Sequence, residues 1–306
     1  MKNNTKKIDK YYALKHEYSG RTVVTIFGIM LILITLTMVF FLISKGSATF
    51  FQNHISLKEF LFSTEWMPGK DEAQGGPAVG ALIFIIGSIL ISGFALLIST
   101  PFSVALAIFM TQISPAFGKK LLQPVIEIFV GIPSVVYGWI GLSVLVPFVR
   151  HQFGGLGFSL LAGSLVLSVM IFPTITSVAA DALSIIPNDY KEASYALGAT
   201  RWHTIRRIIF PTALPGILTG VVLGLARAFG EALAVQMVIG NTIRIPGTIL
   251  DSTVNLTSII TMDMGNTAMG TTWNNALWSM ALLLLIISFI FIFIIHRIGR
   301  KGSASS

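Results

Sequence analysis

Apolar residues along this chain are collected into long segments that carry almost no charge. A helix rises about 1.5 Å per residue, so roughly 20 apolar residues are needed to cross the hydrocarbon core of a bilayer. The six segments that meet this requirement are Val23–Ser44, Val79–Met110, Leu121–Val149, Leu156–Ala180, Ala213–Ile239 and Ala276–Ile295. This pattern predicts an all-α membrane protein with six transmembrane helices.

Two of these spans need separate interpretation. Val23–Ser44 is 22 residues long and uncharged, whereas the apolar core of a signal peptide has roughly 7–15 residues. We therefore expect a retained transmembrane helix. Val79–Met110 is uncharged for 32 residues, which exceeds the needs of one span, and Pro101 lies inside it. Because proline lacks the N–H that a helix interior uses, we expect Pro101 to kink or end this helix.

Composition supports the membrane assignment and excludes several classes of protein. Of the 306 residues, 54% are hydrophobic and 11% are charged, which is about half the charge content of a typical soluble domain. So few charged groups exclude a typical cytosolic enzyme. The chain has no cysteine, which excludes disulfides, thiolate catalysis and cysteine-based metal sites. No cluster of His and acidic residues has the spacing of a metal site.

The positive charges are placed unevenly, and this predicts the topology. Cytoplasmic loops of membrane proteins carry an excess of Lys and Arg. With the N-terminus inside, 15 of the 21 Lys and Arg residues fall in inner segments, five fall in outer segments, and Arg227 lies within a span. Both termini are therefore predicted to be cytoplasmic. The predicted divisions are a cytoplasmic segment 1–22, a transmembrane domain 23–298 with an inner loop 181–212 and outer loops 45–78 and 240–275, and a cytoplasmic tail 299–306.

The inner loop has the signals of two short helices separated by a glycine. Asp189 with Glu192 three residues later is typical of a capping box, which starts a helix. Gly198 suits the end of that helix, and Thr200 is placed to cap a second, basic helix. Two interpretations remain open from the residues alone: a connector whose arginines face anionic headgroups, or a docking element for another protein.

Two charges lie where a membrane span is expected to have none. Arg227 is placed near the middle of the fifth span, and Glu231 follows four residues later on the same predicted helix face. An intramembrane charge indicates a functional site, although a structural Arg–Glu pair is the alternative. A guanidinium binds phosphate-like oxyanions through paired N–H donors. Glu231 is then expected to accept a hydrogen bond from a P–OH group, or to pair with Arg227 when the site is empty.

The inner loop resembles the EAA loop of ABC importer permeases. Glu192-Ala193-Ser194 is followed after three residues by Gly198, and nine residues later by Ile208-Ile209-Phe210-Pro211. The usual pattern has alanine in place of Ser194 and leucine in place of Phe210. The resemblance implies that this loop docks on a cytoplasmic ATPase subunit. The coupling residues that it implies are Glu192, Ala193, Ser194, Gly198, Ile208 and Pro211.

Further segments resemble the permeases of phosphate importers. Gly224–Ala232 is similar to their G-x-x-R-A-x-G-E segment, and Gly131–Gly138 is similar to another of their segments. The residues after the fifth span resemble the PstC-type subunit more than the PstA-type. The resemblance covers Val23 to Arg297 and implies a type I ABC importer permease of MetI-like architecture, which is not an enzyme. Its function would be to form half of a transmembrane pathway for inorganic phosphate in the bacterial inner membrane.

The resemblance also implies partners. These are a second permease subunit of PstA type, a dimer of PstB-type ATPase subunits that hold ATP and Mg²⁺, and an extracytoplasmic phosphate-binding protein of PstS type. The chain itself has no GxxxxGK[ST] motif, so it is not expected to bind ATP. No cofactor is expected in the chain, and the bilayer rather than nucleic acid accounts for its basic charge.

Some alternatives remain open at this stage. One alternative is an ABC importer permease that transports an oxyanion other than phosphate. An ion-coupled secondary transporter would use Arg227 and Glu231 as a gate and would need no ATPase dock. Asn241 and Arg244, just outside the fifth span, are interpreted either as an outer mouth of the pathway or as parts of a solvated loop.

Overall fold

The computed structural model describes the backbone of residues 2–70, 73 and 75–303, and the side chains of residues 20–70, 73, 75–295 and 297. Within this part, six helical segments are long and apolar enough to cross a membrane. They are Gly20–Phe51, Leu82–Ile113, Ser134–Phe153, Leu160–Ser184, Arg201–Gly230 and Thr272–Ile295. The prediction of six transmembrane helices in an all-α fold is confirmed.

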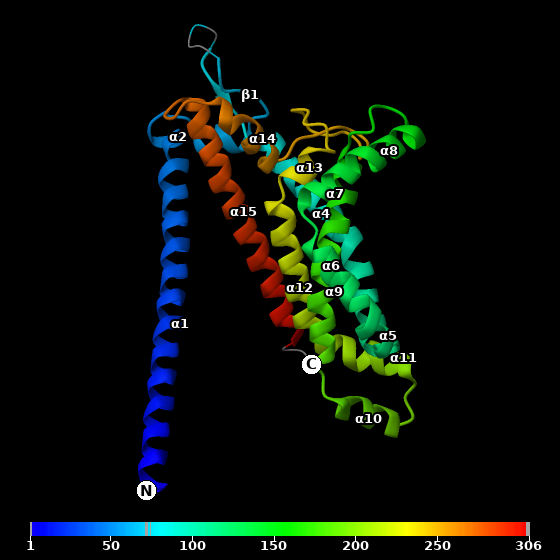
Figure 1. Cartoon of the computed structure of the whole chain (residues 1–306). Helices are drawn as coiled ribbons and strands as arrows, with labels where there is room; N and C mark the ends of the chain where they lie inside the picture. The colour runs from blue at the N-terminus through cyan, green and yellow to red at the C-terminus, as the bar shows by residue number, and fades with distance from the viewer. Residues whose placement is uncertain (1, 71–72, 74, 304–306) are drawn as a thin grey trace.

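The first helix stands apart from the others along most of its length (Figure 1). α1 (Lys2–Gly46) contacts α15 (Thr272–Ser303) near one end, where the Ser279 hydroxyl donates to the carbonyl oxygen of Gly46 at 2.6 Å. Its described apolar side chains are mostly exposed, as suits a surface that faces lipid or another membrane subunit. Figure 1 shows the start of α1, the end of α15 and α10 at the same end of the molecule. The cytoplasmic location of that end stays a prediction.

Three helices form the centre of the molecule. α4 (Leu82–Ile108), α9 (Leu160–Ser184) and α12 (Phe210–Gly230) pack against one another, with α9 in contact with both of the others. α4 continues through Pro101 and ends at Ile108, where a π-helix, η2 (Phe109–Ile113), follows. Pro101 therefore does not end the helix. Membrane helices tolerate proline where neighbouring helices and serine hydroxyls compensate for the missing bond.

The third predicted span is not continuous. α6 (Gln123–Gly131) ends before Ile132, and α7 (Ser134–Ile140) starts after Pro133, so the prediction of one span over 121–149 is wrong. Ile132 is extended, with ψ 128°, because the ring of a following proline disfavours helical backbone at the preceding residue. The helix then proceeds through η4 (Gly141–Leu145) into α8 (Val146–Phe153).

The fifth predicted span is shorter at its outer end than expected. α12 stops at Gly230, and the four-residue helix α13 (Leu233–Gln236) follows. The prediction that the span runs to Ile239 is therefore wrong. Glu231 has φ −76° and ψ 124°, which is an extended conformation, and this change of direction separates the two helices. The apolar pattern continues past the break because α13 buries Ala234 and Val235.

The two long outer loops contain structure of their own. In the first loop, Trp66 pairs with Val79 across a two-stranded antiparallel sheet, and its ring packs edge-on against Phe84. The second loop continues into a helix whose start is capped by Asn255. The remaining elements of the chain are α2 (Ala48–Phe51), α3 (Leu57–Phe62), β1 (Trp66–Met67), β2 (Ala78–Val79), α5 (Pro115–Phe117), η3 (Gly118–Leu122), α10 (Asn188–Ala196), α11 (Arg201–Thr204), η5 (Ile205–Ile209), α14 (Leu256–Asp263) and η6 (Met264–Asn266).

Candidate anion site and coupling surface

Three glycines of α12 let this helix approach α9 closely. Gly216, Gly220 and Gly224 are spaced by four residues and therefore share one helix face. A Cβ atom on Gly216 would lie 2.5 Å from Cβ of Ala182, and one on Gly224 would lie 2.6 Å from Cγ1 of Ile175. Small residues at this spacing allow the close backbone contact on which membrane helix pairs rely. This spacing of small residues is a signal in the sequence from which the close helix contact could have been predicted.

The close approach brings Arg227 against α9. Arg227 follows Gly224 by three residues, so it lies near the same face, and its Nη1 donates a hydrogen bond to Thr174 Oγ1 at 3.0 Å. Its side chain is partly exposed. A guanidinium has five N–H donors, and this bond uses one of them. Arg227 forms no ion pair with any carboxylate in the part of the chain whose side chains are described.

Glu231 lies in a different environment. The residue is buried, and its Oε1 accepts a hydrogen bond from the backbone N–H of Ala234 at 3.0 Å, in the first turn of α13. Its backbone carbonyl accepts a bond from the Thr257 hydroxyl at 2.7 Å, which ties it to α14. The carboxylate therefore acts as a helix cap for α13.

The structure corrects the predicted relation between the two charges. Because α12 ends at Gly230, Arg227 and Glu231 do not share a helix face. Arg227 lies in the last turn of α12, so the prediction that it is near the middle of the fifth span is also wrong. Each has a separate partner, Thr174 for the guanidinium and Ala234 for the carboxylate. The four-residue spacing failed as an indicator here because it holds only while the helix continues.

The first of the two segments that resemble phosphate permeases contacts the chain just after the second. A Cβ atom on Gly138 would lie 2.8 Å from Cα of Ala234, so this glycine allows α7 to pack directly on α13. The hydroxyl of the neighbouring Tyr137 donates to the Phe129 carbonyl at 2.8 Å, across the break between α6 and α7. The tertiary structure thus places the broken third span beside the chain that follows Arg227.

The inner loop folds as two short helices held together by a buried hydrogen bond. The hydroxyls of Ser194 in α10 and Thr204 in α11 lie 2.8 Å apart, and both residues are buried. This bond explains the departure from the usual EAA pattern, because alanine at position 194 would leave Thr204 without this partner. Gly198 ends the first helix with φ +79°, as expected of a glycine at a helix C-terminus.

One expected helix cap forms and the other does not. The Thr200 hydroxyl accepts from the backbone N–H of His203 at 3.3 Å, which confirms this cap. Pro187 occupies the N-cap position of α10 without a side-chain bond, so the capping box of Asp189 and Glu192 is wrong. Proline before the first turn already supplies an extended residue and needs no partner for a backbone N–H.

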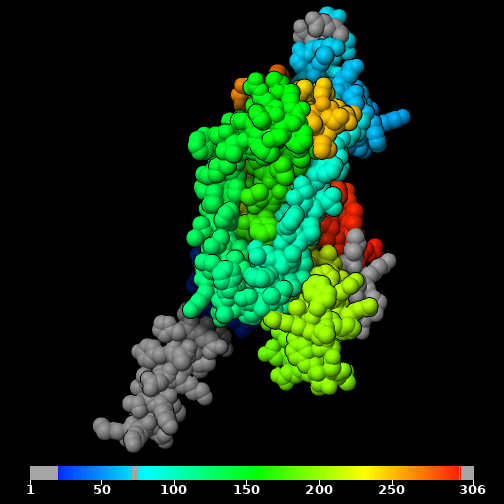
Figure 2. All heavy atoms as spheres, turned by 90° about the vertical axis from the view of Figure 1, so that its right-hand side faces the viewer, coloured from blue at the N-terminus to red at the C-terminus, as the bar shows by residue number. Residues whose placement is uncertain are grey.

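A surface hollow lies along this loop and gathers four of the six expected coupling residues. Its volume is about 610 Å³, and it includes Ala193, Ser194, Gly198 and Ile208. Its other lining residues are Tyr190, Leu197, Ala199, Thr200 and His203. Leu197 is 89% exposed, and Figure 2 shows the yellow-green segment of α10 and α11 projecting from the rest of the molecule. Glu192 and Pro211 are exposed but lie outside this lining.

The inner loop is bonded directly to the transmembrane helices. Arg201 Nη2 donates to the carbonyl oxygen of Ile113 at 2.8 Å, and it also contacts the carbonyl of Gln112. The Gln112 side chain in turn donates to the carbonyl of Leu183 at 3.2 Å. A chain of bonds thus joins α11 to the end of η2 and to the end of α9. The sequence showed Arg201 only as one of several basic residues.

Asn241 and Arg244 are both held within a folded outer loop. The Asn241 side chain donates to the Gln236 carbonyl at 2.9 Å, and Arg244 forms an ion pair with Asp251 at 3.0 Å. Hydrogen bonds from the backbone N–H groups of Thr248 and Gly247, with a smaller contribution from Arg244, hold the pKa of Asp251 below its usual value. The loop is thus internally paired, and Arg244 has a carboxylate beside it.

The fold defines a multi-pass membrane protein of six apolar helices, with two short helices, α10 and α11, at one end. The chain matches the family described as "Binding-protein-dependent transport system inner membrane component" over residues 103–302, and it belongs to this family. It is therefore a permease subunit of an ABC importer in the bacterial inner membrane, and such subunits are not catalytic. This membership favours the ABC importer over the ion-coupled secondary transporter.

Several relatives cover most of the chain. A probable ABC transporter permease protein, YqgH of Bacillus subtilis, is 52% identical over 286 residues, which are 93% of this chain and 91% of the relative. The phosphate transport system permease protein PstC of Haemophilus influenzae is 34% identical, covering 75% of this chain and 76% of its own. PstC of Mesorhizobium japonicum is 33% identical, covering 80% of each chain.

Solved structures support the MetI-like architecture. An inward-facing form of the MetNI methionine ABC transporter matches with a TM-score of 0.52 and 25% identity, covering 71% of this chain and 91% of that one. A bacterial alginate ABC transporter matches with a TM-score of 0.58 and 18% identity, covering 89% of this chain and 94% of that one. The second likeness concerns the fold alone.

Proposed function

We propose that this chain forms half of the membrane pathway of an ATP-driven importer of inorganic phosphate. The observation that carries the proposal is Arg227, a partly exposed guanidinium within the fifth span that is held by a hydroxyl and not by a carboxylate. A charge within an apolar membrane helix is costly and indicates a functional site. The PstC proteins among its relatives are named as phosphate transport permeases, which supports phosphate as the oxyanion.

In this proposal Arg227 binds the anion and Thr174 holds the guanidinium in place. The hydrogen bond to Thr174 orients the planar guanidinium group, and the remaining N–H donors of Arg227 suit the oxygens of phosphate.

Glu231 contributes selectivity for phosphate over sulfate in this proposal. One carboxylate oxygen caps α13, and the other accepts a hydrogen bond from P–OH. Phosphate near neutral pH retains such a proton, whereas sulfate does not.

The coupling surface supports the partner assignments. We place the hollow bounded by Ala193, Gly198 and Ile208 on a PstB-type ATPase dimer, which holds ATP and Mg²⁺. Movement of that dimer would reach α9 through the bonds of Arg201 and Gln112. A PstA-type permease would complete the pathway, and a PstS-type binding protein would deliver phosphate to the outer loops, where Asn241 and Arg244 lie.

The proposal is tested by uptake of labelled phosphate in the assembled transporter. Glu231→Gln keeps an oxygen for the N–H of Ala234, so α13 remains capped while the charge is lost. We expect weaker discrimination between phosphate and sulfate in this variant. Arg227→Gln is expected to abolish phosphate uptake while assembly is retained. Unchanged phosphate uptake and unchanged sulfate rejection in both variants would contradict the assignment.

Docking is tested separately at Gly198. A bulky residue there meets open space but is strained by the positive φ, so it would disturb the loop without filling the membrane core. We expect co-purification with the ATPase to weaken or ATP-driven uptake to fall. If the Gly198→Trp transporter assembles and imports normally, the docking assignment is wrong.

A further inference from the structure

A line of polar residues follows one face of α9 inward from the anion site. Thr174, Ser177, Asp181 and Ser184 are separated by three, four and three residues, so they lie on the same side of the helix. Over this distance the helix rises about 15 Å. Thr174 is the residue that accepts the hydrogen bond of Arg227. The remaining three are exposed, in a segment where the bilayer would favour apolar side chains.

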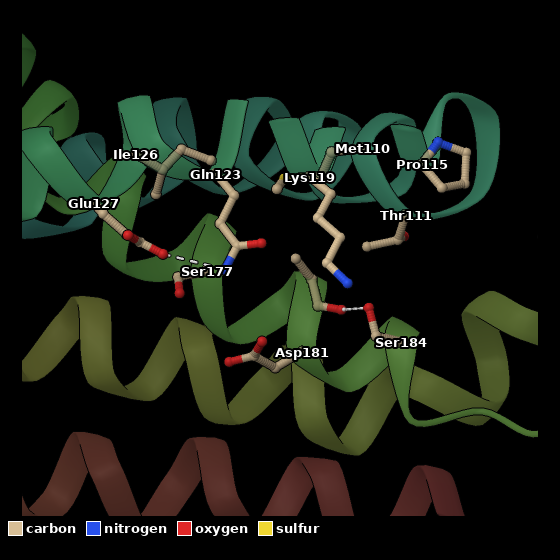
Figure 3. Close-up of a pocket in the computed structure, with 11 residues that line it drawn as sticks. Met110, Thr111, Pro115, Lys119, Gln123, Ile126, Glu127, Ser177, Asp181 and Ser184 are labelled. Atoms are coloured by element: carbon tan, nitrogen blue, oxygen red, sulfur yellow. Dashed lines mark hydrogen bonds between the residues drawn. The ribbon is translucent and has the colours of Figure 1, made fainter. Parts of the chain in front are cut away.

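This polar face opens into a cavity at the inner end of the molecule. The cavity has a volume of about 230 Å³ and lies between α9 and the segment that runs from Met110 to Glu127 (Figure 3). Ser177, Asp181 and Ser184 form part of its lining. Lys119 reaches into it from the opposite side. The line that begins at Arg227 thus ends in a space open to the same side as the coupling loop.

The cavity presents mostly hydrogen-bond acceptors. The hydroxyl of Thr111 donates to the Ala107 carbonyl at 2.7 Å, and that of Ser184 donates to the Ala180 carbonyl at 2.8 Å. The Gln123 amide donates to Glu127 at 3.1 Å. The two hydroxyl donors are occupied by the protein itself, so their oxygens face any ligand as acceptors, and Gln123 keeps one of its two N–H donors.

The charged side chains of the cavity also disfavour the binding of an anion. Asp181 and Glu127 contribute two carboxylates, and Lys119 contributes one ammonium group. None of the three forms an ion pair in the part of the chain with described side chains. The lining is therefore net negative at neutral pH, and its unused donors are Lys119, Ser177 and one N–H of Gln123. Such a lining disfavours the binding of phosphate.

On the basis of the proposed phosphate function, we infer that Thr174, Ser177 and Asp181 line the inner half of the transport route. The cavity is its inner mouth, and the carboxylates of Asp181 and Glu127 lower the affinity of that mouth for phosphate from the cytoplasm. Arg227 holds the anion at the last turn of α12, and Ser177 offers a hydroxyl further along the route. The acceptor-rich mouth does not retain the anion. ATP supplies the direction of transport, and the mouth reduces inhibition by the product.

The route is tested by cysteine accessibility, for which the chain is suited because it contains no cysteine. In the assembled transporter, Ser177→Cys and Ser184→Cys are treated with a membrane-impermeant, negatively charged thiosulfonate. The control is Phe289→Cys, a residue of α15 that is 61% exposed on an apolar helix face. We expect Ser177→Cys to react at least ten-fold faster than the control in the nucleotide-free state. Equal rates for both cysteines and the control would overturn the route, whether or not phosphate is the substrate.

The affinity of the inner mouth for phosphate is tested in proteoliposomes. The ATPase subunits are on the outside of these vesicles, and the binding protein and labelled phosphate are on the inside. Unlabelled phosphate is added outside, where only the cytoplasmic side of the transporter meets it. We expect the double variant Glu127→Gln with Asp181→Asn to be half-inhibited at about ten-fold lower external phosphate than the wild type. Lys119→Gln should shift inhibition in the opposite direction.

The two proposals fail in different ways. If the wild type transports no phosphate, the proposed function is wrong, while the labelling rates still decide the route. If the wild type transports phosphate and the double variant shows unchanged inhibition, the role of the carboxylates is wrong. External sulfate serves as the matched control in the inhibition assay, since a general salt effect would move both anions equally.

Discussion

Replacing Gly216 by alanine tests how closely α12 and α9 must approach. The added Cβ would lie 2.5 Å from Cβ of Ala182, whereas apolar carbon atoms rest at about 3.5–4.0 Å. Alanine has no side-chain torsion that moves its Cβ, so the two helices must separate by about 1 Å. Overpacking of this kind costs about 1–3 kcal/mol, partly offset by the better helix propensity of alanine, about 0.5–1 kcal/mol.

The matched control is Gly93→Ala in α4, where an added Cβ meets no atom within 4 Å. This variant should gain from helix propensity alone. We therefore expect Gly216→Ala to be less stable than Gly93→Ala by about 1–3 kcal/mol, seen as a lower midpoint of thermal denaturation for the purified transporter. A midpoint for Gly216→Ala equal to or above that of Gly93→Ala would refute close α12–α9 packing.

Three further predictions concern single bonds. Thr174→Val removes the acceptor of Arg227 while keeping a similar shape, and we expect phosphate uptake to fall several-fold, with recovery in Thr174→Ser. Arg201→Ala breaks the link from the coupling loop to η2, so import per ATP hydrolysed should decrease in transporters that still assemble. The lowered pKa of Asp251 means that its carboxylate stabilises the loop 240–255 above the ordinary pKa of aspartate, and that this contribution is lost as pH falls through the lowered folded-state pKa. Hydrogen exchange of the loop amides, corrected for intrinsic rates, should show this loss in the wild type and not in Asp251→Asn.

The apolar pattern predicted the membrane class and the number of spans without help from tertiary contacts. This succeeded because a bilayer imposes one length on every spanning helix and excludes unpaired backbone groups. The glycine at 198 and the cap at Thr200 were also predicted, since both depend on neighbouring residues in the chain. These are local properties, and local sequence determines them.

The ends of the helices were less predictable. Hydropathy continued through Pro133 and past Gly230, yet the structure breaks the helix at both places. At the second break, the carboxylate of Glu231 caps α13 and its carbonyl accepts from Thr257, so a residue 26 positions away takes part in holding the turn. A periodicity rule contains no information about such partners.

The sequence by itself determined that this chain spans a membrane six times, has a loop of two short helices divided by a glycine, and places a rare charge, Arg227, in an apolar segment. Only the tertiary structure decided what that charge contacts. The close packing allowed by Gly224 brings Thr174 to Arg227, and the helix end at Gly230 takes Glu231 away to α13. The physical reason is that the tendency of a side chain to leave water depends on its own residue type. A hydrogen bond instead needs two groups, and the whole fold sets their positions.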